Sequence, residues 1–417
     1  MSKEKRRVPK LRFPEFTEDW EQRKLNEFLS VSNLKNTENK YNKKDVLSVS
    51  GDYGIVNQIE FQGRSFAGVS VSNYGVVEKG DIVYTKSPLK LNPYGIIKTN
   101  RINNGIVSTL YAVYKTKENC DSKFIEHYFN LDSRLNQYLK PLVNKGAKND
   151  MKVSSENALV GEVCFPQITE QAMIADLLDR LDIYITLHQR KLDNLKLKKK
   201  ALLQKLFPKN GERYPELRFP EFTDAWEQRK FGELFILKSG VAFKLSEYTK
   251  TGIPIINGES IKAGKISLEK INYLPNEYQY KYQECLLFPG DIVLGLNRPI
   301  IDGTLKISRI PADIKKSLLY QRAGKIIFKV NMDENFTYQL LSKEVLTFTK
   351  KEAVGSDQPF ITTTKLNKWD LYFPVKDKER RNIGSLFNNI DNIITLHQRK
   401  LDHLQLQKKA LLQQMFV

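Results

Sequence analysis

Three stretches of this sequence occur twice, and this repetition constrains the fold more than any other feature. LRFPEFTEDWEQRKL (11–25) returns as LRFPEFTDAWEQRKF (217–231), and TLHQRKLDNLKLKKKALLQKLF (186–207) returns as TLHQRKLDHLQLQKKALLQQMF (395–416). KGDIVYTKSP (79–88) is echoed by PGDIVLGLNRP (289–299). Repetition at a nearly fixed offset indicates duplicated structural units. We therefore predict two units, about 1–207 and 208–417, joined at FPKNGERYP, where Pro208 and Gly211 favour a break.

The similarity between the two units is uneven. Their ends are nearly identical, whereas the interiors, about 30–150 and 235–360, share little beyond Gly-Asp-Ile-Val. After a simple duplication, sequence differences would accumulate throughout both copies, and most slowly in the core. The pattern instead indicates one conserved frame that carries two different domains.

The end of each unit has apolar residues at alternating spacings of four and three, which is typical of a coiled coil. The pattern continues for more than four heptads and predicts helices on the order of 50 Å long. The predicted seam residues are Ile174, Leu178, Leu181, Ile185, His188, Leu192 and Leu195 in the first helix and Ile383, Phe387, Ile390, Ile394, His397, Leu401 and Leu404 in the second.

Polar residues interrupt this seam at equivalent places, at His188 and His397 and again at Lys199 and Lys408. A catalytic or metal-binding histidine pair is one interpretation, but no Asp, Glu or Cys lies on the seam to complete such a site. The alternative is a polar residue that fixes the register of the helix pair. Antiparallel pairing would then place each histidine against a leucine, and Lys199 near Ile390 with its ammonium group directed outward.

The outward faces of these helices are basic, with NLKLKKK (194–200) in the first copy and the milder QLQKK (405–409) in the second. A solvated helix face and a DNA contact both fit this pattern, and the choice stays open.

The two interiors are rich in short β-branched runs separated by Gly, Asn and Pro, which predicts strands and turns. Each continues into a helical stretch, 121–142 or 335–351, then a polar loop with glycine, then a strand that ends in Phe-Pro. The sequence therefore predicts an α+β fold for each domain.

The loops after Gly-Asp-Ile-Val and the later glycine loops carry side chains that can read base edges or hold phosphates. The candidate DNA-binding residues are Lys86, Ser87, Lys90, Asn92, Lys145, Lys148 and Asn149 in the first unit and Asn297, Arg298, Lys306 and Gln358 in the second.

Composition indicates the class of partner. The 67 Lys and Arg residues against 48 Asp and Glu leave a net charge of +19, which favours a polyanion such as nucleic acid. The sequence contains no run of about 18 apolar residues, so we expect no membrane-spanning helix. The three cysteines are far apart in the sequence, which fits a protein of the reducing cytoplasm.

The motifs of a self-contained modifying enzyme do not occur. There is no Walker A motif, no glycine-rich methyl-donor loop, and NPYG (92–95) lacks one proline of the turn that holds a flipped amino group. We therefore predict no catalytic residues, no metal and no cofactor. Two alternatives stay open: an enzyme with an unrecognised motif, and a coiled-coil scaffold with no DNA role.

Two variable domains, each followed by a conserved long helix, with Leu-Arg-Phe-Pro-Glu-Phe…Trp openings and Gly-Asp-Ile-Val cores, resemble the specificity subunit of type I restriction-modification systems over the whole chain. The resemblance implies two α/β target recognition domains, an antiparallel coiled-coil spacer and a pseudo-twofold duplication. It also implies binding of a bipartite, asymmetric double-stranded DNA target, two methyltransferase subunits and restriction or translocase subunits. The expected division is 1–168 for the first recognition domain, 169–207 for the first spacer helix, 208–216 for a linker, 217–376 for the second recognition domain and 377–417 for the second spacer helix.

One departure concerns the start of the second helix. Where the first copy has Glu170-Gln171, the second copy has Glu379-Arg380. This difference predicts unequal docking surfaces for the partner subunits.

Overall fold

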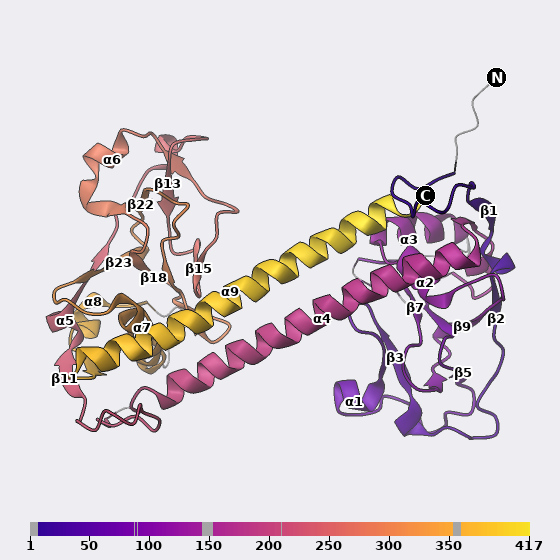
Figure 1. The fold of residues 1–417 in the computed structure, drawn as a ribbon, viewed down its shortest axis with the longest axis horizontal. Helices are drawn as coiled ribbons and strands as arrows, with labels where there is room; N and C mark the ends of the chain where they lie inside the picture. The colour runs from indigo at the N-terminus through magenta and orange to yellow at the C-terminus, as the bar shows by residue number, and fades with distance from the viewer. Residues whose placement is uncertain (1–6, 87, 90, 144–152, 210, 353–359) are drawn as a thin grey trace. The chain divides into compact units, whose positions relative to one another are not determined.

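The computed structural model describes residues 7–417 apart from 87, 90, 144–152, 210 and 353–359. The chain divides into two compact units, one formed by residues 1–189 and 398–417 and the other by 190–397. Each unit thus contains part of both long helices as well as one of the interior domains. Both units consist of runs of consecutive strands followed by helices, as the α+β prediction requires (Figure 1).

Unit 1 is built around a four-stranded antiparallel sheet in the order β2-β9-β6-β7. Two strand pairs, β3–β4 and β5–β8, accompany it, and a further pair, β1–β10, joins the two ends of the domain. The strands are β1 (Glu21–Lys24), β2 (Leu29–Val31), β3 (Leu47–Ser50), β4 (Gly54–Asn57), β5 (Gly75–Val77), β6 (Ile82–Thr85), β7 (Ile97–Thr99), β8 (Gly105–Val107), β9 (Tyr111–Thr116) and β10 (Glu162–Phe165). The helices of this domain are α1 (Gln58–Gln62), α2 (Ser122–Tyr128) and α3 (Asp132–Leu139).

Unit 2 has the same central sheet despite its different sequence. Its order is β12-β23-β18-β21, so each strand occupies the place of its counterpart in unit 1, and β11–β24 repeats the β1–β10 pair. Unit 2 also has a second four-stranded sheet, β16-β13-β22-β17, which contains one parallel pair. In unit 1 the corresponding pairs β3–β4 and β5–β8 are joined by a single parallel bridge between Val46 and Ile106.

The strands of unit 2 are β11 (Glu227–Lys230), β12 (Phe235–Ser239), β13 (Ile253–Ile256), β14 (Ile261–Lys262), β15 (Lys265–Ile266), β16 (Tyr273–Leu274), β17 (Leu286–Leu287), β18 (Ile292–Gly295), β19 (Ile300–Ile301), β20 (Thr304–Leu305), β21 (Ile307–Arg309), β22 (Ser317–Leu319), β23 (Ala323–Phe328) and β24 (Asp370–Phe373). Its helices are α5 (Phe231–Leu234), α6 (Tyr278–Lys281), α7 (Glu334–Glu352) and α8 (Thr363–Leu366).

The predicted helical stretch at 335–351 is the single helix α7, but the stretch at 121–142 is divided into α2 and α3. Both predicted strands that end in Phe-Pro are present, as β10 and β24. The Gly-Asp-Ile-Val motif forms a turn that enters the middle of the sheet. Gly80 and Gly290 have φ values of 95° and 91°, a region that favours glycine, and the aspartate that follows accepts a backbone hydrogen bond within the turn.

The repeated N-terminal segment is fastened to the start of a long helix by the same three side chains in both units. In unit 1 the Arg12 guanidinium donates to both oxygens of Glu170 at 2.8 Å, and Trp20 Nε1 lies 3.4 Å from Glu170 Oε1. In unit 2 the corresponding Arg218–Glu379 distances are 2.8 and 2.9 Å. We call each set of three an Arg–Glu–Trp clasp, the second being completed by Trp226 at 3.4 Å.

The clasps show that the departure at Glu379-Arg380 is a local one. Glu379 has the same partners as Glu170, and the change is confined to the next residue. Gln171 donates to the carbonyl of Pro166 at 2.9 Å, and Arg380 donates to the carbonyl of Pro374 at 3.0 Å. The predicted inequality of docking surfaces stays a prediction.

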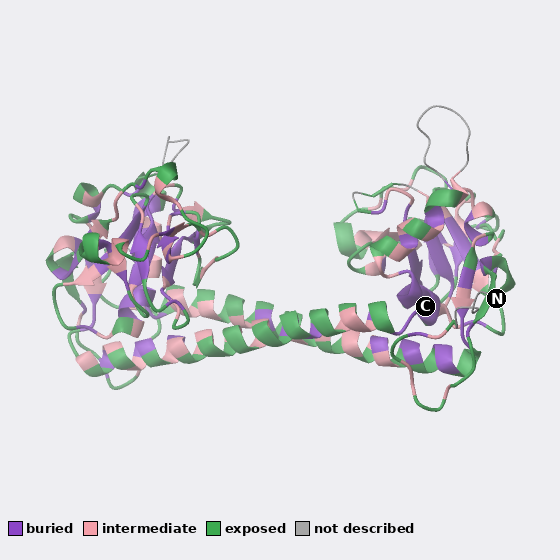
Figure 2. Cartoon of the chain, turned by 90° about the horizontal axis from the view of Figure 1, so that it is seen from above, coloured by how far each residue is buried: buried purple, intermediate pink, exposed green. Residues whose placement is uncertain are grey.

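The two conserved helices are α4 (Ile168–Lys205) and α9 (Asp377–Gln414), each 38 residues long. Burial recurs along both at the predicted seam while most other positions are exposed (Figure 2). All fourteen predicted seam residues are buried or half-buried. Among the described residues, no helix is long and apolar enough to cross a membrane.

Contacts within each unit show that the helices run antiparallel. In unit 1, Leu178 of α4 shares the hydrophobic core with Leu412 of α9, and in unit 2, Leu206 of α4 shares the core with Ile383 of α9. Early residues of one helix thus lie with late residues of the other. The helix ends reach into the domain cores, because Phe416 and Phe207 are almost fully buried there.

Lys199 lies close to the predicted neighbour Ile390, and its ammonium has a partner that was not predicted from the sequence. Lys199 Nζ lies 2.6 Å from Asp391 Oδ1, and Lys408 Nζ lies 2.6 Å from Asp182 Oδ1. The antiparallel register was correct to within one residue, and the aspartate next to the predicted neighbour brings a carboxylate within reach of each half-buried lysine. The two ion pairs are equivalent in the duplicated frame.

Candidate nucleic-acid interface

The loop that follows β6 carries the first group of predicted DNA-binding residues. Lys86 continues directly from the buried strand, and its backbone N–H donates to the carbonyl of Leu110 at 3.2 Å. Its side chain is half-buried. Burial and the nearby charge of Lys35 lower the pKa of Lys86, with Glu156 acting in the opposite direction. Two ammonium groups near the end of one strand form a site that an anion would stabilise.

Asn92 lies in the same loop but is mostly buried, with 8% of its surface exposed. Its amide donates to Asp132 Oδ1 at 2.8 Å, while its Oδ1 has no hydrogen-bond partner in the described part of the chain. Asn92 also lines a cavity of about 260 Å³ together with Lys98 and Asn130. A base contact by Asn92 would use this unpaired oxygen, and it stays a prediction.

The corresponding loop of unit 2 follows β18. Asn297 forms an isolated β-bridge with Phe360, and Arg298 is exposed with a φ of 45°, an uncommon conformation for a residue with a side chain. Lys306 is buried, with 7% exposure, and its ammonium lies 3.5 Å from the carbonyl oxygen of Asn297. The two strands of the β19–β20 hairpin thus place Arg298 and Lys306 on either side of one short loop.

Lys306 belongs to a cluster of positive charges. Burial lowers the pKa of Lys306, and the neighbouring charges of Lys262 and Arg298 lower it further, whereas Glu259 raises it. Three cations share one carboxylate at this place. An anion placed here would relieve the mutual repulsion of these cations.

The remaining predicted residues lie outside the described residues, so the structure gives no account of them. They are Ser87, Lys90, Lys145, Lys148, Asn149 and Gln358.

Lys35 and Lys262 were missed by the sequence-based prediction. Lys35 forms an isolated β-bridge with Gly75, and Lys262 belongs to the β14–β15 hairpin. Both come from segments that carry no repeated motif, and they approach the predicted residues only through the pairing of strands. No spacing in the sequence indicates this proximity.

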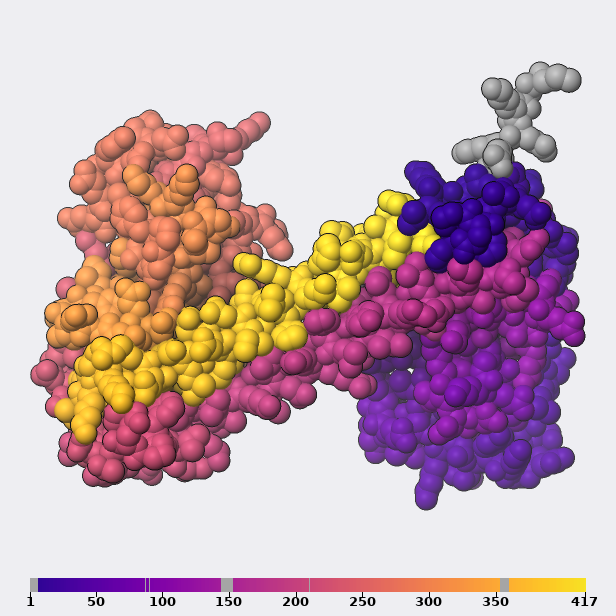
Figure 3. Space-filling view, in the orientation of Figure 1, coloured from indigo at the N-terminus to yellow at the C-terminus, as the bar shows by residue number. Residues whose placement is uncertain are grey.

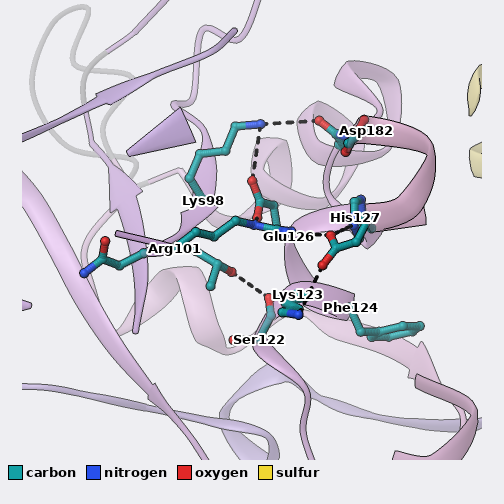
Figure 4. A network of polar contacts seen from close by, with 12 residues as sticks. Lys98, Arg101, Ser122, Lys123, Phe124, Glu126, His127 and Asp182 are labelled. Atoms are coloured by element: carbon teal, nitrogen blue, oxygen red, sulfur yellow. Dashed lines mark hydrogen bonds and ion pairs between the residues drawn. The ribbon is translucent and has the colours of Figure 1, made fainter. Parts of the chain in front are cut away.

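A second polar group, also unpredicted, attaches the recognition domain of unit 1 to α4. Asp179 on α4 lies 2.6 Å from Arg101 Nη1, 2.8 Å from His127 Nε2 and 3.2 Å from Lys123 Nζ. The three cationic or imidazole side chains are drawn in Figure 4. Burial raises the pKa of Asp179, but the hydrogen bonds from His127 and Arg101 outweigh it and hold this pKa well below its usual value.

The same network includes buried charges on the sheet side. Glu126 accepts from Arg101 Nε at 2.8 Å and lies 3.9 Å from Lys98 Nζ (Figure 4). Burial lowers the pKa of Lys98, and the charge of Glu126 partly offsets this. Unit 2 has Asn388 at the position equivalent to Asp179. The two recognition domains are therefore attached to the frame by different chemistry.

Within the described residues, no three His, Cys, Asp or Glu side chains gather as a metal ion would require.

Comparisons with known proteins agree on one family. Residues 17–197 and 223–406 match the family described as type I restriction modification DNA specificity domain. The chain is 32% identical over 259 residues to the type I restriction enzyme MjaVIII specificity subunit of Methanocaldococcus jannaschii, covering 60% of each chain. It is 30% identical over 105 residues to the EcoAI specificity subunit of Escherichia coli, covering 25% of this chain and 18% of the other. The matched part thus spans less than two thirds of these relatives.

A solved S subunit of a type I restriction-modification system from M. genitalium shares the fold. Its TM-score is 0.63 at 15% identity, and the match covers 98% of this chain and 99% of that chain.

Proposed function

The chain belongs to the family of type I restriction-modification DNA specificity proteins, and we propose that it reads a bipartite, asymmetric double-stranded DNA target with its two recognition domains. The proposal is supported by the contrast between the repeated parts of the two units and the cationic loops, which are not repeated. The two units share their central sheet order and their clasps, but their cationic loops differ in residues and in position. Two different readers on one repeated frame fit a target with two unlike halves, since identical readers on a pseudo-dyad would read a palindrome.

The proposed contacts are of two kinds. Lys35 and Lys86 in unit 1, and Lys262, Arg298 and Lys306 in unit 2, hold DNA phosphates and position the duplex. Reading of the bases falls to the neighbouring polar loop residues, including Asn297 and the predicted residues outside the described part of the chain. The clustering of positive charge with few carboxylates supports the phosphate assignment.

We propose that the chain is non-catalytic and that separate methyltransferase and restriction subunits carry the chemistry. Exposed apolar side chains at equivalent positions of α4 and α9 support the docking of two like partner subunits, because large exposed apolar groups are typical of protein interfaces. The three equivalent pairs are Tyr184 and Ile393, Leu187 and Leu396, and Leu197 and Leu406.

We also propose that the long helices set the unread gap between the two half-sites. Inserting one heptad into each of α4 and α9 lengthens the helix pair by about 10.5 Å, which corresponds to roughly three base pairs of duplex. An unchanged gap in such a variant would reject this role for the helices.

The decisive experiment maps methylated adenines in cells that express this chain together with its methyltransferase subunit. The expected result is one motif in two unlike parts with a fixed gap. A palindromic motif, or no motif that depends on this chain, would reject the proposal. A control with purified chain, methyl donor and DNA separates the catalytic alternative, because methyl transfer without any other subunit would show that the chain is itself an enzyme.

A further inference from the structure

The stretch of α4 at residues 190–200, RKLDNLKLKKK, is the most cationic segment of either helix. Five of its basic side chains are exposed to solvent: Arg190, Lys191, Lys196, Lys198 and Lys200. The sixth, Lys199, lies in the seam and is neutralised by Asp391 at 2.6 Å. Asp193 is the only acidic residue of the segment. The outward face therefore keeps its positive charge while the inward lysine does not.

These exposed cations are close together. Ten residue steps of helix cover about 15 Å, so five positive charges lie within that length. Lys196 and Lys200 are four residues apart and share one face, and Lys191 and Lys198 are seven residues apart and share another. None of the five has a carboxylate partner within the part of the chain that the structure describes. Like charges at these spacings destabilise a helix slightly, so this density of charge indicates an external anion.

A comparison of α9 with α4 shows whether the exposed charges are needed for the helix to form. α9 repeats the same apolar positions, but Gln405 and Gln407 stand where α4 has Lys196 and Lys198. The helix and its seam therefore form without these two charges. Their presence in α4 alone is not explained by folding.

We propose that residues 190–200 of α4 form a binding site for the phosphates of duplex DNA that does not read sequence. The inference rests on the proposed function for the identity of the polyanion. Duplex DNA presents one phosphate charge for about every 1.7 Å of its axis, so a segment with exposed cations on its solvent-facing sides fits a phosphate backbone. Lysine is a flexible point charge, which suits phosphate contacts that must tolerate any sequence. Figure 3 shows that α4 is open along much of its length on the face drawn.

The test uses the full chain and a 30-base-pair duplex of arbitrary sequence, with binding measured by fluorescence anisotropy from 50 to 300 mM NaCl. The variant is Lys196→Gln/Lys198→Gln/Lys200→Gln, which at its first two positions adopts the residues of α9. Each phosphate contact contributes about 0.9 to the slope of log K against log salt, so the slope should fall by about 2 to 3. A Lys→Arg change at the same three positions should keep the wild-type slope, because the charge is retained.

A matched control removes three exposed charges elsewhere in unit 2, by Lys250→Gln/Lys270→Gln/Lys315→Gln. This control has the same net charge as the variant and should keep the wild-type slope. If the variant also keeps that slope, the DNA site on α4 is rejected while the proposed function stands. If the variant instead loses affinity for the methyltransferase subunit at an unchanged DNA slope, the cations bind an acidic protein surface. If the wild-type chain shows no salt-dependent DNA binding, the proposed function itself fails.

Discussion

The clasp at Glu170 gives the sharpest test of how the frame is held together. Glu170 is 1% exposed and accepts two hydrogen bonds of 2.8 Å from Arg12, which is 14% exposed. Side-chain hydrogen bonding to Glu170 raises the pKa of Arg12, so the guanidinium stays charged in any accessible pH range. Glu170→Gln removes the negative charge from this buried pair and leaves the shape of the side chain nearly unchanged.

The magnitude follows from the burial of both partners. Removing one member of a buried ion pair costs about 3–5 kcal/mol, because the other charge is left uncompensated. Glutamine keeps one oxygen that can accept from Arg12, and the arginine is slightly exposed to water. We therefore expect a loss of about 2–4 kcal/mol in the free energy of opening of unit 1.

Hydrogen exchange measured by mass spectrometry is the suitable assay, because it reports each unit separately in a chain that need not unfold in one step. The loss should appear in β1, β10 and the start of α4, with unit 2 unaffected. Glu379→Gln should give the same loss in unit 2 alone, since its clasp has the same geometry. Glu21→Gln is the exposed control. It removes the ion pair between Arg23 and Glu21, whose side chain is 61% exposed, and should lower the free energy of opening by no more than about 0.5 kcal/mol. A cost below about 1 kcal/mol for Glu170→Gln would refute the argument that burial makes this pair strong.

Two further pairs of substitutions test other contacts of unit 1, each against a matched position. Asp179→Asn should destabilise unit 1 by about 1–3 kcal/mol at pH 7. Because the pKa of Asp179 in the folded state is held below its unfolded value, the stability difference between the wild type and the variant should persist down to about pH 5 and narrow as the pH falls further. Asn388→Asp, at the equivalent position, should bring no comparable increase in stability. Denaturation curves at several pH values check both expectations. Gly95→Ala should cost about 3 kcal/mol or more in thermal or chemical unfolding, since φ is 95° and the new Cβ would lie 1.7 Å from the carbonyl oxygen of Thr85. Gly80→Ala, at the same φ but with open space around it, should cost only about 1 kcal/mol, and equal costs would contradict the steric explanation.

Periodicity along the chain predicted the helices and strands whose formation depends on the spacing of residues close together in the sequence. The alternating spacing of apolar residues identified the seam of α4 and α9, and the β-branched runs identified the strands around Gly-Asp-Ile-Val. The antiparallel register followed from the symmetry of the repeat. It did not predict the ion pair of Lys199, because a periodicity argument considers which residues are apolar and overlooks a carboxylate one position away at Asp391.

The contacts that cross the sheet could not be predicted in the same way. Lys262 approaches Lys306 because the turn of the β14–β15 hairpin lies against β21, where the Gly264 N–H donates to the carbonyl of Ile307 at 2.8 Å. No pattern within one strand predicts this long-range contact. The burial of Asn92 was missed for a similar reason. Its loop is polar in sequence, but Asp132 at the start of α3 lies against it and takes its amide hydrogen bond. Polar loop composition predicts exposure on average and says nothing about such a partner.

The identical clasps and the different loops have one physical explanation. Each clasp joins three buried side chains from two distant segments, so a change at any one of them leaves a buried charge or donor unpaired. The shared sheet order is retained for a related reason: β1 with β10, and β11 with β24, must close each domain onto its helix. Arg298, in the loop after β18, carries no such coupling because its side chain is exposed, whereas Asn92 and Lys306 are buried in their loops. Exposed loop residues such as Arg298 can therefore change while the frame stays fixed.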